Sequence, residues 1–411
     1  MPTIFLNGVF VSPDQAKVSA FDAGFQHGVG LFETMQAIRT KQSAIGSGGS
    51  RVLFLDEHMA RLANSAKSLG LTERLRIDPL AEAVRRATRQ AFEDHPDATH
   101  IRLRLTLTGG DLNLLDRART AAAQAGGEVE VEIPEQTPTM LIVGQRATKY
   151  PEEMFQRGVL ATIADLKLNP LDPFAGHKTL NYWARLRELQ VAASKRAAEA
   201  LVFQITNHLA GGCVSNVLLV KDDVVLTPIA QGEEAEVAHG GDGAAAFGTS
   251  RDRDEMKDAR RELADGLNNG LNDEMEDGSD DEMEDGFDDE DDLPQRGNES
   301  VNGRASNRTS GTLEEGAQQS GGGGVGAIMP SPVLPGIVRR WALDVALSEA
   351  MATQRRMLTI EDVLEADEVI LTNSSWGALP VTRLEGRPIG TGSVGAFAKR
   401  LREAWVELTT G

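Results

Sequence analysis

The spacing of apolar residues near the N-terminus predicts two helices. In residues 52–71, and again in residues 80–92, apolar positions recur every three or four residues, which places them on one face of a helix. In the first segment these positions are Leu55, Met59, Leu62, Ala66 and Leu69. Both segments therefore predict amphipathic helices that cover a core.

Residues 100–108 show a different period. Aliphatic residues alternate there with polar ones, as expected for a strand with one buried face, so that Arg102 and Arg104 share the polar face. Residues 116–139 are rich in Ala, Gly, Glu and Pro and are typical of a linker. We therefore predict a first mixed α/β domain over residues 1–139.

A second mixed α/β domain is expected over residues 140–411. Its predicted strands are residues 140–143, 200–206 and 214–221. The last of these strands returns through Asp222-Asp223 into VVLTP, which predicts a hairpin.

Two helices of this second domain carry candidate chemistry. The segment KTLNYWARLRELQVAASK repeats an apolar residue every three positions, which predicts a helix with Lys178 at its N-terminal edge. A further helix is predicted after Leu334-Pro335-Gly336, because Pro favours the first turn of a helix.

The composition changes abruptly between residues 231 and 327, where Gly, Asp, Glu, Asn and Ser dominate. DEMEDG occurs twice, at 273–278 and 281–286, and a GGGG run follows at 321–324. Such a segment cannot bury enough apolar surface to offset its ordering entropy. We predict a long disordered acidic insertion in the second domain, for which a solvated spacer and a partner-binding role are both open.

Charge and cysteine content narrow the class of protein. The formal net charge is −20, but residues 273–292 hold 14 acidic residues and no Lys or Arg, which leaves −6 for the remainder. A mildly acidic body without a Lys/Arg cluster argues against nucleic-acid binding. Cys213 is the only cysteine, and we find neither a signal-peptide pattern nor a long apolar stretch. A cytoplasmic protein without membrane spans is therefore expected.

Seven segments, taken in order, resemble the class IV aminotransferase family, which includes branched-chain and D-amino acid aminotransferases and aminodeoxychorismate lyases. They are FDAGFQHGVGLFETM (21–35), FLDEHMARL (54–62), HIRLRLTLTGG (100–110), HKTLNY (177–182), GGCVSNVLLVKDDVVLTP (211–228), LPGIVR (334–339) and ADEVILTNSSWGALPV (366–381). The resemblance implies the two-domain fold type IV of pyridoxal-phosphate enzymes. It also implies a homodimer with the active site between the domains.

In that family a lysine in a K-x-x-N setting forms the aldimine with pyridoxal 5'-phosphate and moves the proton between the substrate α-carbon and the cofactor. Lys178 of KTLN matches it. A cofactor lysine must lose its proton, which partial burial near another cation promotes. The alternative is an exposed lysine at a helix start. No metal is implied.

The resemblance also indicates how the cofactor phosphate is held. Arg61 of DEHMARL matches the family's phosphate-binding arginine, although an ordinary solvated helix arginine is the alternative. The helix start after Gly336 offers the backbone N–H groups of Ile337 and Val338. Ser374 and Ser375 of TNSS are expected to complete the phosphate site, or else to form a plain turn.

The substrate side is expected to involve the first domain. Arg102 matches the family's I-R strand and is our candidate for the substrate carboxylate, while a solvated strand face would explain the paired arginines equally well. Phe32 and Thr34 of LFET are expected to line the active site.

One position departs from the family pattern. The family reads E-G-x-x-S-N, and its glutamate bonds the pyridine nitrogen of the cofactor; this chain has Gly211 in that place. The carboxylate keeps the ring nitrogen protonated and so makes the ring an electron sink. Another acid from elsewhere in the fold, a bridging water, or chemistry that needs less of the sink would each account for its absence.

Three functions follow from this sequence. The leading one is a branched-chain-like amino-acid aminotransferase acting through Lys178. The second is a lyase of the aminodeoxychorismate type, which releases pyruvate from an amino-aromatic precursor. The third is a catalytically impaired homologue whose acidic insertion recruits a partner.

Overall fold

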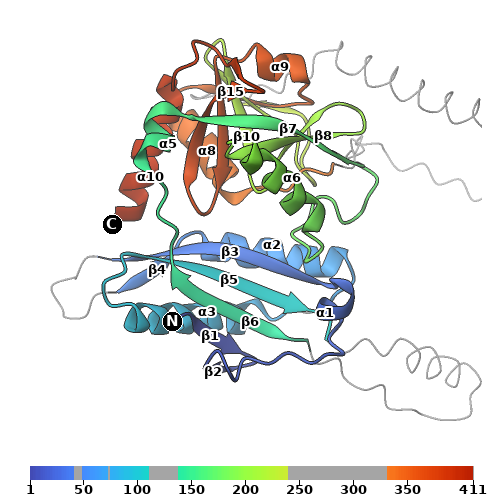
Figure 1. Ribbon diagram of the computed structural model, residues 1–411, viewed down its shortest axis with the longest axis vertical. Helices are drawn as coiled ribbons and strands as arrows, with labels where there is room; N and C mark the ends of the chain where they lie inside the picture. The colour runs from blue at the N-terminus through green and yellow to red at the C-terminus, as the bar shows by residue number, and fades with distance from the viewer. Residues whose placement is uncertain (41–48, 73–74, 111–137, 239–330, 411) are drawn as a thin grey trace, which may run out of the picture. The chain divides into compact units, whose positions relative to one another are not determined.

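The computed structural model describes residues 1–40, 49–72, 75–110, 138–238 and 331–410 (Figure 1). All of them belong to one compact unit. Residues 116–137 of the linker predicted at 116–139, and residues 239–327 of the insertion predicted at 231–327, lie outside the described residues. Disorder of the insertion therefore stays a prediction.

The N-terminal part forms a six-stranded sheet of order β2-β1-β6-β5-β3-β4. Its elements are β1 (Thr3–Leu6), β2 (Val9–Val11), α1 (Ala23–His27), β3 (Gly30–Arg39), β4 (Ser50–Val52), α2 (Leu55–Ser68), α3 (Ile77–Asp94), β5 (His100–Thr108) and β6 (Met140–Arg146). Both predicted helices and the strand at 100–108 are present. Helices α2 and α3 share one hydrophobic core with the aliphatic face of β5. Arg102 and Arg104 consequently lie on the opposite face of the sheet.

The C-terminal part forms a ten-stranded sheet. Nine strands follow the order β12-β13-β11-β10-β14-β15-β7-β8-β9, and the short β16 pairs with β15 in addition. Its elements before residue 239 are α5 (Glu152–Arg157), β7 (Val159–Leu168), α6 (Trp183–Ser194), β8 (Glu199–Gln204), β9 (Leu209–Gly212), β10 (Asn216–Lys221), β11 (Val224–Thr227) and β12 (Glu236–Ala238). Its elements from residue 331 onward are α8 (Ile337–Ser348), β13 (Ala352–Arg355), α9 (Ile360–Leu364), β14 (Glu368–Asn373), β15 (Gly377–Leu384), β16 (Arg387–Pro388) and α10 (Ala396–Thr410). The α/β fold class is confirmed.

Apolar side chains of helices α6, α8 and α10 pack on this second sheet. Residues of α8 and α10 share a core with β10 and β14, while α6 packs on β7 and β8. The predicted hairpin is confirmed: β10 pairs with β11 around Asp222 and Asp223, both with positive φ. No helix in the described ranges is both long and apolar enough to cross a membrane.

One predicted boundary is misplaced. The strand at residue 140, with which the second domain was expected to begin, is β6, and it pairs with β5 and β1 in the first sheet. An alternating strand pattern does not reveal which partner the strand pairs with. The division into two domains stays a proposal, with the boundary moved to the segment between β6 and α5.

The helix expected from Lys178 begins later in the structure. Residues 178–182 are not helical, and α6 starts at Trp183. The predicted apolar face is not buried, since Trp183 is 80% and Leu186 47% exposed, whereas Glu188 and Ala192 of this helix are buried. Lys178 therefore lies in an irregular segment instead of at a helix edge.

The start of the predicted acidic insertion is part of the fold. Residues 236–238 form β12, which pairs with β13, and Gln231 donates its backbone N–H to Val333 O. The assignment of residues 231–238 to a disordered insertion is thus wrong. The acidic composition of this short segment is explained by ion pairs, in which Glu233 and Glu236 contact Arg339 and Arg355.

Candidate active site

A cavity of about 530 Å³ brings together most of the candidate residues. Strands β3 and β5 of the first sheet and helix α2 form one side of the cavity. The other side is formed by the segment around Lys178, the start of α6, the turn at residues 212–215, the start of α8 and the turn after β14. The candidates that line it are Phe32, Thr34, Arg61, Arg102, Lys178, Ile337, Val338, Ser374 and Ser375. Gly211 is not among the lining residues, whereas its neighbour Gly212 is. The predicted residues thus meet in one place, although their sequence positions span more than three hundred residues.

Backbone pairing with β3 positions Lys178. The carbonyl oxygen of Lys178 accepts the backbone N–H of Phe32 at 2.9 Å, and Leu180 N donates to Gly30 O at 3.0 Å. The Lys178 Nζ atom lies 4.6 Å from the centroid of the Phe32 ring. The segment that contains Lys178 is therefore hydrogen-bonded to β3, and this pairing holds the amine over the Phe32 ring.

The electrostatic surroundings favour the neutral amine of Lys178. Burial in the cavity wall disfavours the charged form, and the Arg61, Arg185 and Arg104 guanidinium groups add to the effect, so that the pKa of Lys178 falls to about 7. Glu33 opposes the shift only in part. A large fraction of this amine is thus available as a nucleophile or base at neutral pH.

This environment predicts the pH dependence of Lys178 reactivity. Only the neutral amine is nucleophilic, so acylation of Lys178 in the cofactor-free protein should rise through a midpoint near pH 7, instead of the 10.5 of an ordinary lysine. Quantitative peptide mapping after brief labelling measures it, with the exposed Lys195 as the reference in each digest. Arg104→Gln should move the midpoint upward. A Lys178 midpoint equal to that of Lys195 would contradict this description.

A second wall of the cavity is suited to an anion. Gly336 is the N-cap of α8, and the N–H groups of Ile337 and Val338 in its first turn have no partner within the helix. The Thr372 hydroxyl on β14 is buried against this cavity and has no hydrogen-bond partner among the described residues. An unpaired buried hydroxyl is costly unless something binds it. These donors fit the phosphate of a pyridoxal cofactor, and Thr372 is a residue that the sequence did not single out.

The TNSS turn lies beside these donors. Asn373 accepts the backbone N–H groups of Ser375 and Trp376, at 2.8 and 3.1 Å. Asn373 therefore closes the turn, and Ser374 and Ser375 line the cavity from it. Both of the expectations for TNSS, a turn and a place in the site, describe the same segment.

Arg61 has another partner besides any ligand. Its Nε and NH2 atoms donate to the two carboxylate oxygens of Glu33 at 2.8 and 2.6 Å, and NH1 donates to Pro335 O at 3.0 Å. Burial alone would raise the pKa of Glu33, but Arg61 and His58 outweigh it and hold that pKa far below its usual range. The bidentate face of the guanidinium is thus occupied, which leaves outward N–H groups for a phosphate.

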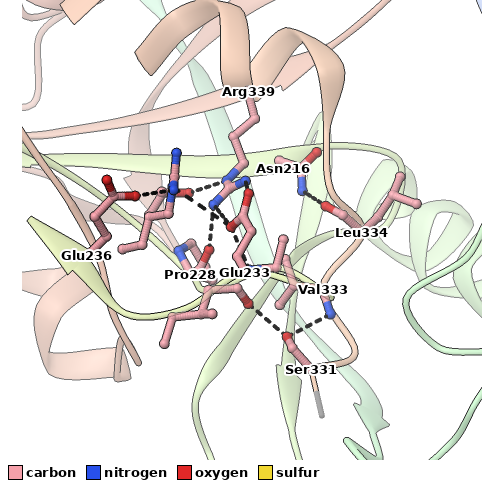
Figure 2. A network of polar contacts seen from close by, with 12 residues as sticks. Asn216, Pro228, Glu233, Glu236, Ser331, Val333, Leu334 and Arg339 are labelled. Carbon is pink, nitrogen blue, oxygen red and sulfur yellow. Dashed lines mark hydrogen bonds and ion pairs between the residues drawn. The ribbon is translucent and has the colours of Figure 1, made fainter. Parts of the chain in front are cut away.

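Helix α8 is held in place by an ion pair between the buried Arg339 and the partly buried Glu233 (Figure 2). The Arg339 side chain is 1% exposed and binds both carboxylate oxygens of Glu233, at 2.8 and 2.7 Å. It also donates to Thr227 Oγ1 and Pro228 O. Because Arg339 follows Val338 directly, this network fixes the helix start that faces the cavity. The side chain of Asn216 adds a bond to Leu334 O at 2.8 Å.

Two arginines face the cavity from β5. The Arg104 guanidinium stacks on Phe32 with its carbon 3.9 Å from the ring centroid, on the same ring that Lys178 approaches. Burial raises the pKa of Tyr150, and Arg102 is close enough to oppose that shift. Neither arginine makes an ion pair with any described residue. Both cations are therefore free to bind an anionic ligand, and Arg104 is the one that sequence matching passed over.

The place of the missing family glutamate is occupied by backbone. Gly211 has φ +148°, a conformation that side-chain-bearing residues rarely adopt, so a glutamate there would be strained. An acid that contacts this turn is Glu199 of β8, which is fully buried and accepts from Ser215 Oγ at 2.8 Å and from the N–H groups of Cys213 and Val214. Glu199 thus holds the turn from behind the cavity wall and does not line the cavity.

An arginine lies on the cavity side of the same turn. Arg185 of α6 lines the cavity and donates NH1 to Gly212 O at 3.1 Å and to Cys213 O at 3.5 Å. Tyr182 also donates to Cys213 O, at 3.0 Å. Sequence reasoning missed Arg185 and Tyr182, because it placed both in a helix that begins at Lys178, whereas α6 begins at Trp183.

Known proteins are similar to this chain in sequence and in fold. The profile of the class IV amino-transferases matches residues 30–233 and 327–384. A provisionally assigned branched-chain-amino-acid aminotransferase of Methanocaldococcus jannaschii is 30% identical over 55% of this chain and 67% of its own length. The D-alanine aminotransferase of Staphylococcus epidermidis is 27% identical over 55% and 69%. Among solved structures, the branched-chain amino acid aminotransferase from Escherichia coli superposes with TM-score 0.61 at 18% identity, over 100% of this chain and 94% of that one.

Proposed function

Because this chain belongs to the class IV aminotransferase family, we propose that it is a pyridoxal-phosphate-dependent amino-acid aminotransferase with Lys178 as its cofactor lysine. The observation that carries the proposal is the Lys178 amine, which lies in the cavity at a pKa of about 7. When bound, the cofactor would supply the carbonyl that accepts an amino group and the ring that withdraws electrons from the substrate α-carbon.

Different residues of the cavity would hold the cofactor phosphate and carry out the proton transfer. Ile337, Val338 and the hydroxyl of Thr372 would hold the phosphate, with Ser374, Ser375 and an outward N–H of Arg61 beside them. Lys178 would hold the cofactor covalently and, once released by the substrate amine, take the proton from the α-carbon as its neutral amine.

We assign the substrate carboxylate to Arg104. Arg104 and Lys178 share the Phe32 ring, so a carboxylate bound to this arginine brings the α-carbon near the amine. Arg102, close to Tyr150, would contact the outer end of the substrate, with Thr34 in the wall between the strands. The names of the relatives suggest branched-chain amino acids and D-alanine as the first substrates to assay.

The test of this function is amino transfer itself. Protein loaded with cofactor is incubated with a ¹⁵N-labelled amino acid and an unlabelled 2-oxo acid, and mass spectrometry follows the label into the new amino acid. Transfer is expected. Absence of transfer with every amino donor would contradict the proposal. Pyruvate release from an amino-aromatic substrate without any oxo-acid acceptor would favour the lyase alternative instead.

Substitution of the arginines tests how the substrate is bound. Arg104→Gln removes a charged hydrogen-bond partner, worth about 1.5–3 kcal/mol, so KM for the amino acid should rise roughly 10- to 100-fold. Arg102→Gln is the matched control on the same strand face and should change KM less for a small monocarboxylic substrate. A larger effect of Arg102→Gln would exchange the two roles. A homodimer and a cytoplasmic location stay predictions of the sequence.

A further inference from the structure

The ring nitrogen of a pyridoxal cofactor must face one particular part of this cavity. In the pyridine ring the nitrogen lies opposite the carbon that bears the aldehyde, and the phosphate arm leaves from a carbon beside the aldehyde. Under the proposed function, Lys178 takes the aldehyde and the donors of α8 and β14 take the phosphate. The arginines of β5 take the substrate. The wall that remains is formed by the start of α6 and the turn at residues 212–215.

That wall offers a cation and no anion. Of its described lining residues only Arg185 carries a charge. Tyr182 donates its hydroxyl to Cys213 O, and the Ser215 hydroxyl donates to Glu199 behind the wall. Glu199 itself already accepts from two backbone N–H groups of the turn as well as from Ser215. The carboxylate is therefore engaged away from the cavity.

Arg185 retains the donors that such a contact needs. Among the described residues Arg185 donates hydrogen bonds through NH1 alone, to two carbonyl oxygens, and it makes no ion pair with any described carboxylate. We propose that the Arg185 guanidinium, in place of a carboxylate, contacts the ring nitrogen of the cofactor in this protein. The inference rests on the proposed function and deepens it.

The chemistry of the guanidinium decides the protonation of the ring. A guanidinium only donates hydrogen bonds, so a ring nitrogen that pairs with it must accept and must therefore carry no proton. A carboxylate would instead accept a hydrogen bond from the ring nitrogen and so keep that nitrogen protonated. The ring of this enzyme should then withdraw electrons from the substrate α-carbon less strongly than a protonated ring does, which places more of the catalytic demand on Lys178.

The ring nitrogen can be observed directly. Wild-type protein is loaded with pyridoxal phosphate labelled with ¹⁵N in the ring, and the ¹⁵N chemical shift is followed across the neutral pH range. We expect the shift of an unprotonated pyridine throughout. A protonated nitrogen in the wild type would overturn the proposal. This readout needs no turnover and no variant.

Variants then identify the partner. Arg185→Gln keeps an amide donor but removes the charge, so the pKa of the ring nitrogen should rise by about one to three pH units. Arg185→Lys keeps the charge and should leave the nitrogen unprotonated, and Glu199→Gln should leave its shift unchanged. A Glu199→Gln variant that alone changes the shift, or an Arg185→Gln variant that titrates like the wild type, would overturn the proposal.

Failure of the proposed function can be distinguished from failure of the Arg185 assignment. If labelled cofactor does not attach to Lys178, the proposed function fails and this inference with it. If the cofactor attaches to Lys178 and its ring nitrogen is protonated, only the assignment of Arg185 is wrong.

Discussion

Lys178→Ala should lower turnover with amino acid substrates by at least about 10³-fold. The substitution removes the amine that attaches the cofactor and also the base that moves the substrate proton, and general base catalysis alone contributes about 10²- to 10⁴-fold. Affinity for the cofactor should fall much less, because the donors of α8, Thr372 and Arg61 are retained. Steady-state kinetics and equilibrium dialysis measure the two effects separately.

Two controls make this prediction specific. Lys195→Ala removes an exposed lysine from the end of α6 and should leave turnover unchanged. Adding a small primary amine to Lys178→Ala should restore part of the activity, since a free base can replace the missing one. Retention of more than a tenth of wild-type turnover by Lys178→Ala would assign the chemistry to another residue.

Glu233→Ala should destabilise the protein by about 3–5 kcal/mol, the usual cost of leaving one member of a buried ion pair without its partner. Arg339 is 1% exposed, and Glu233 supplies its only carboxylate contacts among the described residues. Burial alone would raise the pKa of Glu233, yet Arg339 lowers it, in keeping with an ionised pair. Because Arg339 belongs to the first turn of α8, cofactor affinity should fall as well.

Glu236→Ala is the matched control for this second prediction. Glu236 lies three residues further along and pairs with Arg355 at the surface, so its loss should cost less than about 1 kcal/mol. Urea denaturation of both variants gives the comparison. Equal losses for the two glutamates would show that the buried pair does not fasten α8.

The ion pair of Glu233 with Arg339 also bears on where the insertion can be cut. An excision of residues 231–327 removes Glu233 and β12, whereas an excision of residues 239–327 retains both. Of the two, the longer excision should show the loss of stability found for Glu233→Ala.

Local patterns in the sequence predicted both long helices of the first half and one strand of its sheet, β5, whereas β1 to β4 were not predicted. The alternation at residues 100–108 gave β5 with its bounds, because one face of that strand packs on α2 and α3. It also placed Arg102 and Arg104 together on the other face, where the structure has the cavity. The family motifs predicted most of the cavity wall, including Lys178, since residues of all seven motifs line it.

What local patterns could not predict depends on contacts between distant residues. Glu233 looked like the beginning of an acidic, coreless segment, and its partner Arg339 is more than a hundred positions away. Glu199 sits in an apolar strand and is satisfied by a turn that begins at Cys213. The apolar spacing around Trp183 predicted a buried face for α6, but this face is exposed in the single chain.

The central claim is that Lys178 carries the cofactor, and chemical fixation tests it most directly. The protein is loaded with pyridoxal phosphate, treated with borohydride to reduce the covalent link between cofactor and lysine, digested, and analysed by mass spectrometry. We expect the added phosphopyridoxyl mass on the peptide that contains His177-Lys178-Thr179 and on no other. A stoichiometric label on any other lysine, or no label at all in protein that is folded and saturated with cofactor, would contradict it.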